Sequence, residues 1–159
     1  WHVAYHGTVP AALPSILGAC RLVPPGGTVA SSSGAAEVVG VRAGHIGGPH
    51  WRWNCHAGYW EWFDPLQIFL SPSIRYSELP QYAKYTKFDS KVSGHMKNAQ
   101  VAFKVRLRPD SYKVGQETVG ATWTIDRHFD NASIEFYTKG DEHGSHILTG
   151  LLVRIVCED

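Results

Sequence analysis

The clearest structural signal in the sequence is a strand pattern near the middle of the chain. Val101, Phe103, Val105 and Leu107 alternate with small or charged residues, which is the period-2 pattern of a β-strand that buries one face. A turn signal, Arg-Pro-Asp-Ser at 108–111, follows it. Because a strand of this kind is stable only in a sheet that is covered on its apolar side, the chain is expected to fold around a β-sheet.

Other segments extend this β-rich interpretation. Residues 2–6 and 66–70 have the pattern of short strands, and in 133–138 Ile134 and Phe136 share one face while Glu135 and Tyr137 share the other. Residues 151–156 are continuously apolar, as in a central strand. By contrast, residues 86–100 are polar and turn-like.

Only two short helices are expected, both in the first half of the chain. Apolar residues fall at helical spacing over 13–20, where Pro10 and Pro14 limit the helix to a few turns. Ser71 can cap a second helix, which Pro80 interrupts. The fold class predicted is therefore α+β, with more strand than helix and no internal repeat.

Length, net charge and cysteine content indicate how many domains this protein has and in which compartment it is expected. The 159 residues form one domain of ordinary size, and a net charge of +1 provides no electrostatic attraction for nucleic acid. Three cysteines are too few and too widely spaced for a disulfide framework, which favours an intracellular location, cytoplasmic or nuclear, within a larger protein. No apolar run approaches the length that spans a membrane, so no membrane partner is expected.

Residues 26–63 form a segment rich in Gly, Ser and Trp that is interpreted as an insertion. Its first part, 26–48, reads as a loop, and 50–63 reads as a hairpin. Four tryptophans in that hairpin could recognise an acceptor protein, but the favoured prediction is that the hairpin buries its aromatic face. The segment also holds four candidate metal ligands at spacings that match no standard zinc site, so no metal is predicted; they are His45, His50, Cys55 and His56.

Three motifs, in this order along the chain, resemble those of the poly(ADP-ribose) polymerase-like ADP-ribosyltransferases. The first is His-Gly-Thr at the end of a strand, followed by Ile16-Leu17 and an Arg-Leu-Val-Pro-Pro turn at 21–25. The second is a strand followed by Ser-x-Ser-x-x-Tyr, and the third is a glutamate on a late strand with another apolar strand after it. The motif positions are His6, Gly7, Thr8, Ser71, Ser73, Tyr76 and Glu135.

The resemblance implies a fold of two packed, mainly antiparallel sheets with an NAD cleft between them. It also implies that NAD is the co-substrate, that ADP-ribose is transferred to acceptor proteins, as single units by preference, and that nicotinamide is released. The charge that develops on the ribose in such a reaction is stabilised by a carboxylate, and Glu135 is the candidate.

The same resemblance distributes the binding roles. The backbone of Gly7 and the hydroxyl of Ser73 would hold the nicotinamide carboxamide, and Tyr76 would stack on its ring. His6, which the resemblance places with Glu135 among the catalytic residues, would bind a hydroxyl of the adenosine ribose, with Thr8 beside it in the cofactor site. In a purely structural interpretation, Ser73 is a helix cap and Tyr76 is a half-buried helix residue.

One position departs from the family pattern. Phe69 stands where the family has a tyrosine, so an aromatic wall remains but its hydroxyl is absent. This leaves open a second function, a module that binds NAD, ADP-ribose or a protein without transfer. A third, RNA 2′-phosphotransferase, belongs to the same broad superfamily, but it is disfavoured because Tyr5 precedes His6 and the charge is near neutral.

Overall fold

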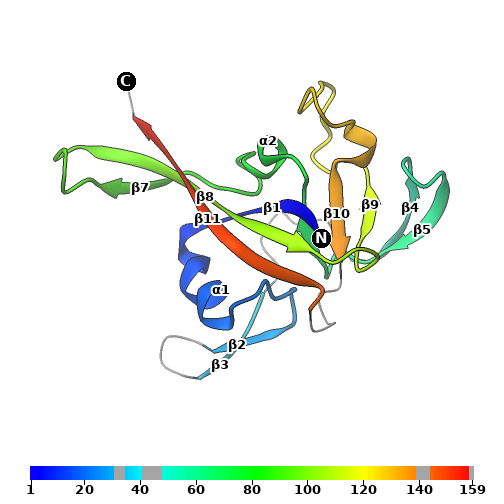
Figure 1. The fold of residues 1–159 in the computed structure, drawn as a ribbon, viewed down its shortest axis with the longest axis horizontal. Coiled ribbons are helices and arrows are strands. Elements are labelled where there is room, and N and C mark those ends of the chain that lie inside the picture. Colours follow the sequence, from blue (N-terminus) through cyan, green and yellow to red (C-terminus); the bar gives the residue numbers. More distant parts are fainter. Residues whose placement is uncertain (31–34, 41–47, 139–143, 158–159) are drawn as a thin grey trace.

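A computed structural model describes residues 1–30, 35–40, 48–138 and 144–157. All strand pairs between its named strands are antiparallel, and the helices are short, so the predicted β-rich α+β class is confirmed. Figure 1 shows long strands crossing the middle of the molecule, with helix α1 on one side of them.

The largest sheet is built around one long strand. This strand, β8 (Met96–Leu107), contains the alternating segment that dominated the sequence pattern. On one side it pairs with β11 (His146–Cys157). On the other side it pairs directly with two strands, with β7 (Thr86–Asp89) along its first residues and with β1 (His2–Thr8) along the rest. The order β1-β8-β11 therefore places the strand with the strongest period-2 pattern at the centre.

A second sheet carries the late glutamate. It has the order β6-β10-β9, formed by β6 (Ile68–Leu70), β10 (Glu135–Thr138) and β9 (Lys113–Gly115). Tyr5 of β1 exchanges two backbone hydrogen bonds with Ser71, which directly follows β6. This bridge connects the two sheets, and it brings the first sequence motif next to the second.

Two hairpins and a few helical turns complete the described chain. Pro10 and Pro14 restrict the first helix as expected, so that a 3-10 turn (Pro10–Ala12) precedes a helix of seven residues. Within the described residues no helix has both the length and the apolar character needed to span a membrane. These elements are the hairpins β2 (Thr28–Ala30) with β3 (Ala36–Val38) and β4 (His50–Asn54) with β5 (Tyr59–Phe63), the helices α1 (Leu13–Ala19) and α2 (Ile74–Ser77), and the 3-10 turn Asn131–Ser133.

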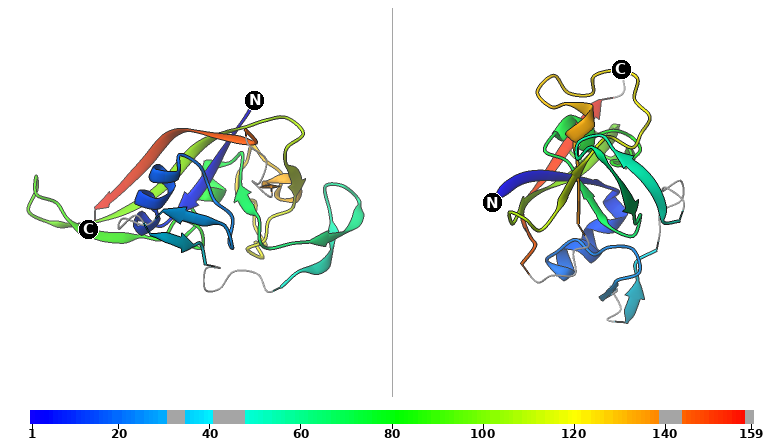
Figure 2. Two further views of the ribbon diagram at one scale, coloured as in Figure 1. Left: turned by 90° about the horizontal axis from the view of Figure 1, so that it is seen from below. Right: turned by 90° about the vertical axis from the view of Figure 1, so that its right-hand side faces the viewer.

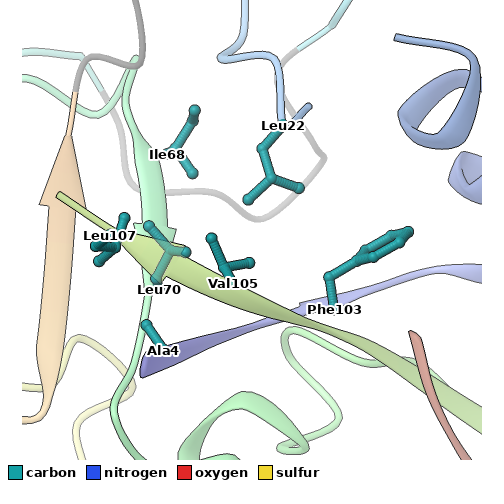
Figure 3. Close-up of a cluster of buried hydrophobic side chains, with 7 residues drawn as sticks. All are labelled: Ala4, Leu22, Ile68, Leu70, Phe103, Val105 and Leu107. Atoms are coloured by element: carbon teal, nitrogen blue, oxygen red, sulfur yellow. The ribbon is translucent and has the colours of Figure 1, made fainter. Parts of the chain in front are cut away.

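The hydrophobic core lies between the two sheets and the segment after α1. Apolar side chains of β8 meet those of β1 and β6, and one residue after α1 closes the cluster (Figure 3). Burial of this kind is the main source of folding free energy. The buried members are Ala4, Leu22, Ile68, Leu70, Phe103, Val105 and Leu107.

Several local predictions were wrong, for identifiable reasons. The apolar segment 151–156 lies in an edge strand rather than a central one, because β8 occupies the centre of the sheet. Residues 86–100 are mostly strand, since β7 and the start of β8 pair there despite their polarity. Ser71 does not cap α2; Ser73 does, as its structural interpretation predicted, and its hydroxyl accepts a hydrogen bond from the backbone N–H of Tyr76.

The aromatic hairpin is oriented opposite to the prediction. Its four tryptophans lie on the outer face, with exposed fractions of 44–63%, while its polar face is buried. On that inner face Glu61 accepts hydrogen bonds from Arg52 at 3.0 Å and from Tyr137 of β10 at 2.7 Å. The buried ion pair and its hydrogen bonds attach the hairpin to the second sheet, and this leaves the tryptophans outside.

Candidate functional site

One cavity of the described structure contains most of the site residues predicted from the sequence. It has a volume of about 480 Å³ and is lined largely by apolar side chains. Strand β1, the segment after α1, the β2–β3 hairpin, β6, α2 and β10 all contribute to its wall. Six of the predicted residues line it: His6, Gly7, Thr8, Phe69, Tyr76 and Glu135.

Strand β1 supplies the first motif. The Nδ1 atom of His6 lies 2.7 Å from the carbonyl oxygen of Phe69 on β6. Because a carbonyl oxygen can only accept, Nδ1 carries a proton in this contact, which fixes the orientation of the imidazole. Thr8 is buried at the end of the strand, and both residues face the cavity.

Gly7 is required by the close approach of β1 to α2. A Cβ atom at this position would lie 2.0 Å from the carbonyl oxygen of Ser77 and 3.1 Å from the Cβ of Tyr82. The backbone of Tyr5, two residues earlier, bonds to Ser71 rather than to β8. Since backbone groups alternate along a strand, the N–H and C=O of Gly7 point to that same side, away from β8.

Ser71 holds the two sheets together at the floor of the site. It is fully buried, and its hydroxyl donates to the carbonyl of Ile134, the residue before β10, at 2.6 Å. Its backbone bonds to Tyr5, and its hydroxyl also accepts from the N–H of Ser73. This one residue fixes β1, β10 and the start of α2 relative to each other.

Glu135 lies in a network of hydroxyl groups. Its Oε2 accepts hydrogen bonds from the hydroxyl of Tyr76 at 2.9 Å and from that of Thr118 at 2.8 Å. The hydroxyl of Tyr82 is 2.7 Å from that of Tyr76 and 3.1 Å from that of Thr118. Its other oxygen, Oε1, is buried without a hydrogen-bond partner among the described residues.

Burial changes the ionisation of this carboxyl group. Desolvation raises the pKa of Glu135 from 4.5 to about 7, although the hydrogen bonds from Thr118 and Tyr76 and the charge of Arg52 act in the opposite direction. The pKa of Tyr82 is raised to about 12, first by burial and then by the negative charge of Glu135. Near neutral pH, Glu135 therefore exists in both its charged and its neutral form.

Ser73 does not line the cavity. Its side chain is 1% exposed, and its hydroxyl donates to Oδ2 of Asp126 at 2.7 Å while accepting from the N–H of Tyr76. This hydrogen bond and one from the backbone of His128 lower the pKa of Asp126. In this arrangement Ser73 caps α2 and attaches it to the segment that precedes β10.

Phe69 contributes an aromatic wall, as predicted from its side chain. Its ring packs against Phe63 of the aromatic hairpin and Tyr137 of β10, with centroids 5.7 and 6.4 Å apart. The hairpin is thus part of the support of the cavity wall. The β2–β3 hairpin also lines the cavity, through Val29 and Val38 among others, so the segment predicted as an insertion takes part in the site.

Three residues of the site carried no signal in the sequence. Tyr82, Thr118 and Asp126 are isolated polar residues of irregular segments, and only the fold brings them to Glu135 and Ser73. The candidate metal ligands His50, Cys55 and His56 form no cluster suited to a metal within the part of the chain that the structure describes. The fourth candidate, His45, lies outside the described residues.

Comparison with known proteins leaves the chain without an assigned family. No family model matches the sequence, and no solved structure matches the fold. The site must therefore be interpreted from its own geometry.

Proposed function

We propose that this domain is an NAD-dependent ADP-ribosyltransferase that transfers ADP-ribose, as single units, to side chains of acceptor proteins. The observation that carries the proposal is the position of Glu135. A carboxylate that is 1% exposed, with one oxygen that lacks a hydrogen-bond partner among the described residues, lines the same cavity as His6, from near the start of the chain, and Tyr76, from its middle. In this proposal the fold is a variant of the ADP-ribosyltransferase fold, with NAD in the cavity between the sheets.

The cavity has the chemical features that nicotinamide requires. Tyr76 and Phe69 provide aromatic surfaces for a flat ring. The N–H and C=O of Gly7 point away from β8, and they can donate and accept hydrogen bonds as a carboxamide requires. His6 lines the cavity with its imidazole oriented by the carbonyl of Phe69, and in this proposal it binds a ribose hydroxyl.

We assign the catalytic role to Glu135 because its carboxylate carries a negative charge. The bond between the nicotinamide nitrogen and the ribose carbon breaks, and its electron pair leaves with nicotinamide. The acceptor side chain forms the new bond to the same carbon and releases a proton to solvent. A negative charge beside the ribose stabilises the cationic character of the transition state. Oε1 of Glu135 can provide this charge, because no described residue forms a hydrogen bond with it.

The test compares Glu135→Gln with a matched surface carboxylate. Labelled NAD is incubated with the folded domain, and both nicotinamide release and label on protein are followed. Loss of one electrostatic contact of this kind lowers rates by about a hundredfold or more. The control is Glu78→Gln, because Glu78 pairs with Arg154 outside the cavity. Equal release by wild type and Glu135→Gln would refute the assignment.

A second function, binding of NAD or ADP-ribose without transfer, is favoured by two specific observations. Phe69 has no hydroxyl, and the hydroxyl of Ser73 is engaged by Asp126 and buried. Both positions would otherwise contribute a polar contact to the ligand. Calorimetry with NAD and with ADP-ribose separates the two functions, because a binding module retains affinity while releasing no nicotinamide.

A further inference from the structure

The long strand β11 has one edge that the described chain leaves unpaired. It pairs with β8 over its length, and β8 is its only neighbour in the sheet order. In the left view of Figure 2, β11 runs along the upper border of the molecule. Natural proteins usually protect such an edge with lysine, proline or a covering element. The segment 146–157 has no proline or lysine, and Arg154 is its one charged residue.

The hydrogen bonds of the sheet show which backbone groups face this edge. The N–H and C=O of Tyr5 on β1 are both used by Ser71. The backbone of Lys104, which lies opposite Tyr5 on β8, therefore points away from β1 and toward β11. Lys104 pairs with Gly150, so the backbone of Gly150 is directed to β8.

Alternation along the strand then determines the other residues. Leu152 and Arg154 direct their backbone groups to β8, as Gly150 does, whereas Leu151, Val153 and Ile155 present theirs to the free edge. The side chains of these same three residues are 40%, 55% and 48% exposed. Leu151 and Val153 lie opposite Phe103 and Val101, so they continue the apolar face of β8 out to the edge.

We propose that this edge binds a second copy of the chain, forming an antiparallel β11–β11 pair about a two-fold axis at Val153. In this register Val153 faces Val153 of the second copy, and Leu151 faces its Ile155. The three pairs that result supply about six backbone hydrogen bonds, two for each pair. Two copies of the sheet then become one continuous sheet, and this proposal does not depend on the NAD site.

Self-complementarity of shape and charge identifies the occupant as a second copy. The exposed residues Leu151 and Ile155 lie two positions on either side of Val153, so a two-fold axis at Val153 places apolar side chains opposite apolar side chains. A register in which Arg154 faces Arg154 of the second copy is disfavoured, because it places two like charges directly opposite each other in a non-hydrogen-bonded pair, where side chains lie closest. Arg154 instead faces Leu152 of the second copy, and its charge is paired with Glu78 at 2.9 Å within its own chain.

The first test measures oligomeric state against concentration. Because the interface is small, sedimentation velocity is run up to roughly 100 µM, where a weak but specific dimer becomes populated. Val153→Lys places two charges together at the axis and is expected to give a monomer. Trp60→Lys, on the exposed tryptophan face, is the matched control and is expected to remain dimeric. A monomeric wild type, or a dimer lost only in Trp60→Lys, would overturn the proposal.

A second test checks the register and does not depend on the stability of a charged variant. In a background with Ser at all three native cysteines, Val153→Cys is expected to form a disulfide-linked dimer under mild oxidation. Leu151→Cys is the control, since two copies of Leu151 lie about 13 Å apart along the edge, four residues at 3.3 Å each. Equal cross-linking by both variants would refute this register, and no cross-linking by Val153→Cys would refute the interface.

Discussion

Replacement of Glu135 by glutamine is expected to raise the stability of the fold relative to wild type as pH rises, while it removes activity. The side chain keeps its size, and the glutamine oxygen can still accept from Tyr76 and Thr118, as Oε2 does now. The change removes a charge that the site holds in a buried position. Functional groups of this kind commonly lower stability, because they are desolvated in a way that only the reaction exploits.

The magnitude follows from the ionisation of the buried carboxyl. The pKa of Glu135 is about 7 in the folded protein, against an ordinary value of 4.5 for this group. Because the folded state binds the proton more tightly, stability is lost as pH rises from about 4.5 to 7 and is constant above that range. At pH 8 the ionised group destabilises the fold by about 3 kcal/mol, and at pH 5 by less than about 1 kcal/mol.

The assay is urea denaturation of wild type and Glu135→Gln at these two pH values. Glutamine places an N–H₂ group where Oε1 has no partner, which costs about 1–3 kcal/mol at any pH. The informative quantity is therefore the change in relative stability with pH. Glutamine is expected to gain about 2 kcal/mol relative to wild type between pH 5 and pH 8. A pH-independent difference would show that Glu135 titrates normally and would refute this reasoning.

Three further substitutions test separate parts of the site. Gly7→Ala is expected to destabilise the fold by about 2 kcal/mol or more in thermal denaturation, because its Cβ would meet the carbonyl of Ser77, while Gly18→Ala in α1 meets nothing and should stabilise it. Tyr76→Ala should weaken a nicotinamide-like inhibitor by about tenfold in calorimetry, whereas Tyr76→Phe should retain most of the affinity because stacking remains. Phe69→Tyr is expected to raise NAD turnover, and equal or lower turnover in a folded variant would show that the cavity is adapted to phenylalanine.

The sequence predicted the site and the fold best where the residues belong to a short motif or a regular local pattern. His6, Gly7 and Tyr76 belong to motifs with short internal spacing, and the structure places all three at one cavity. The alternating strand was equally clear, because its period alone determines which side chains are buried. These features depend on neighbours in the chain, so they can be predicted without knowing the topology.

Residues that act through long-range contacts could not be predicted in this way. Thr118 and Asp126 lie in a polar segment without periodicity, and each becomes part of the site only when that segment folds beside α2. The role of Ser73 changed for the same reason. Its motif position implied a contact with ligand, but the presence of Asp126 at 2.7 Å gives its hydroxyl a partner within the protein.

The orientation of the aromatic hairpin shows how a buried polar network can override hydrophobic pattern. If apolar area alone decided, burying the four tryptophans would stabilise the fold more than burying the opposite face does. That face, however, carries Arg52 and Glu61, and Tyr137 of the second sheet donates its hydroxyl to the same carboxylate. The guanidinium of Arg52 also lies 3.6 Å from the centroid of the Phe63 ring, so the apolar and charged groups of the inner face pack together.

This arrangement links the hairpin to the chemistry of the cavity. Arg52 lowers the pKa of Glu135 through its charge, while the rings of Phe63 and Tyr137 support Phe69 at the cavity wall. If the tryptophans faced inward, Glu135 would lose a nearby cation and its pKa would rise above about 7. The buried polar face therefore favours the ionised carboxylate that the proposed reaction needs.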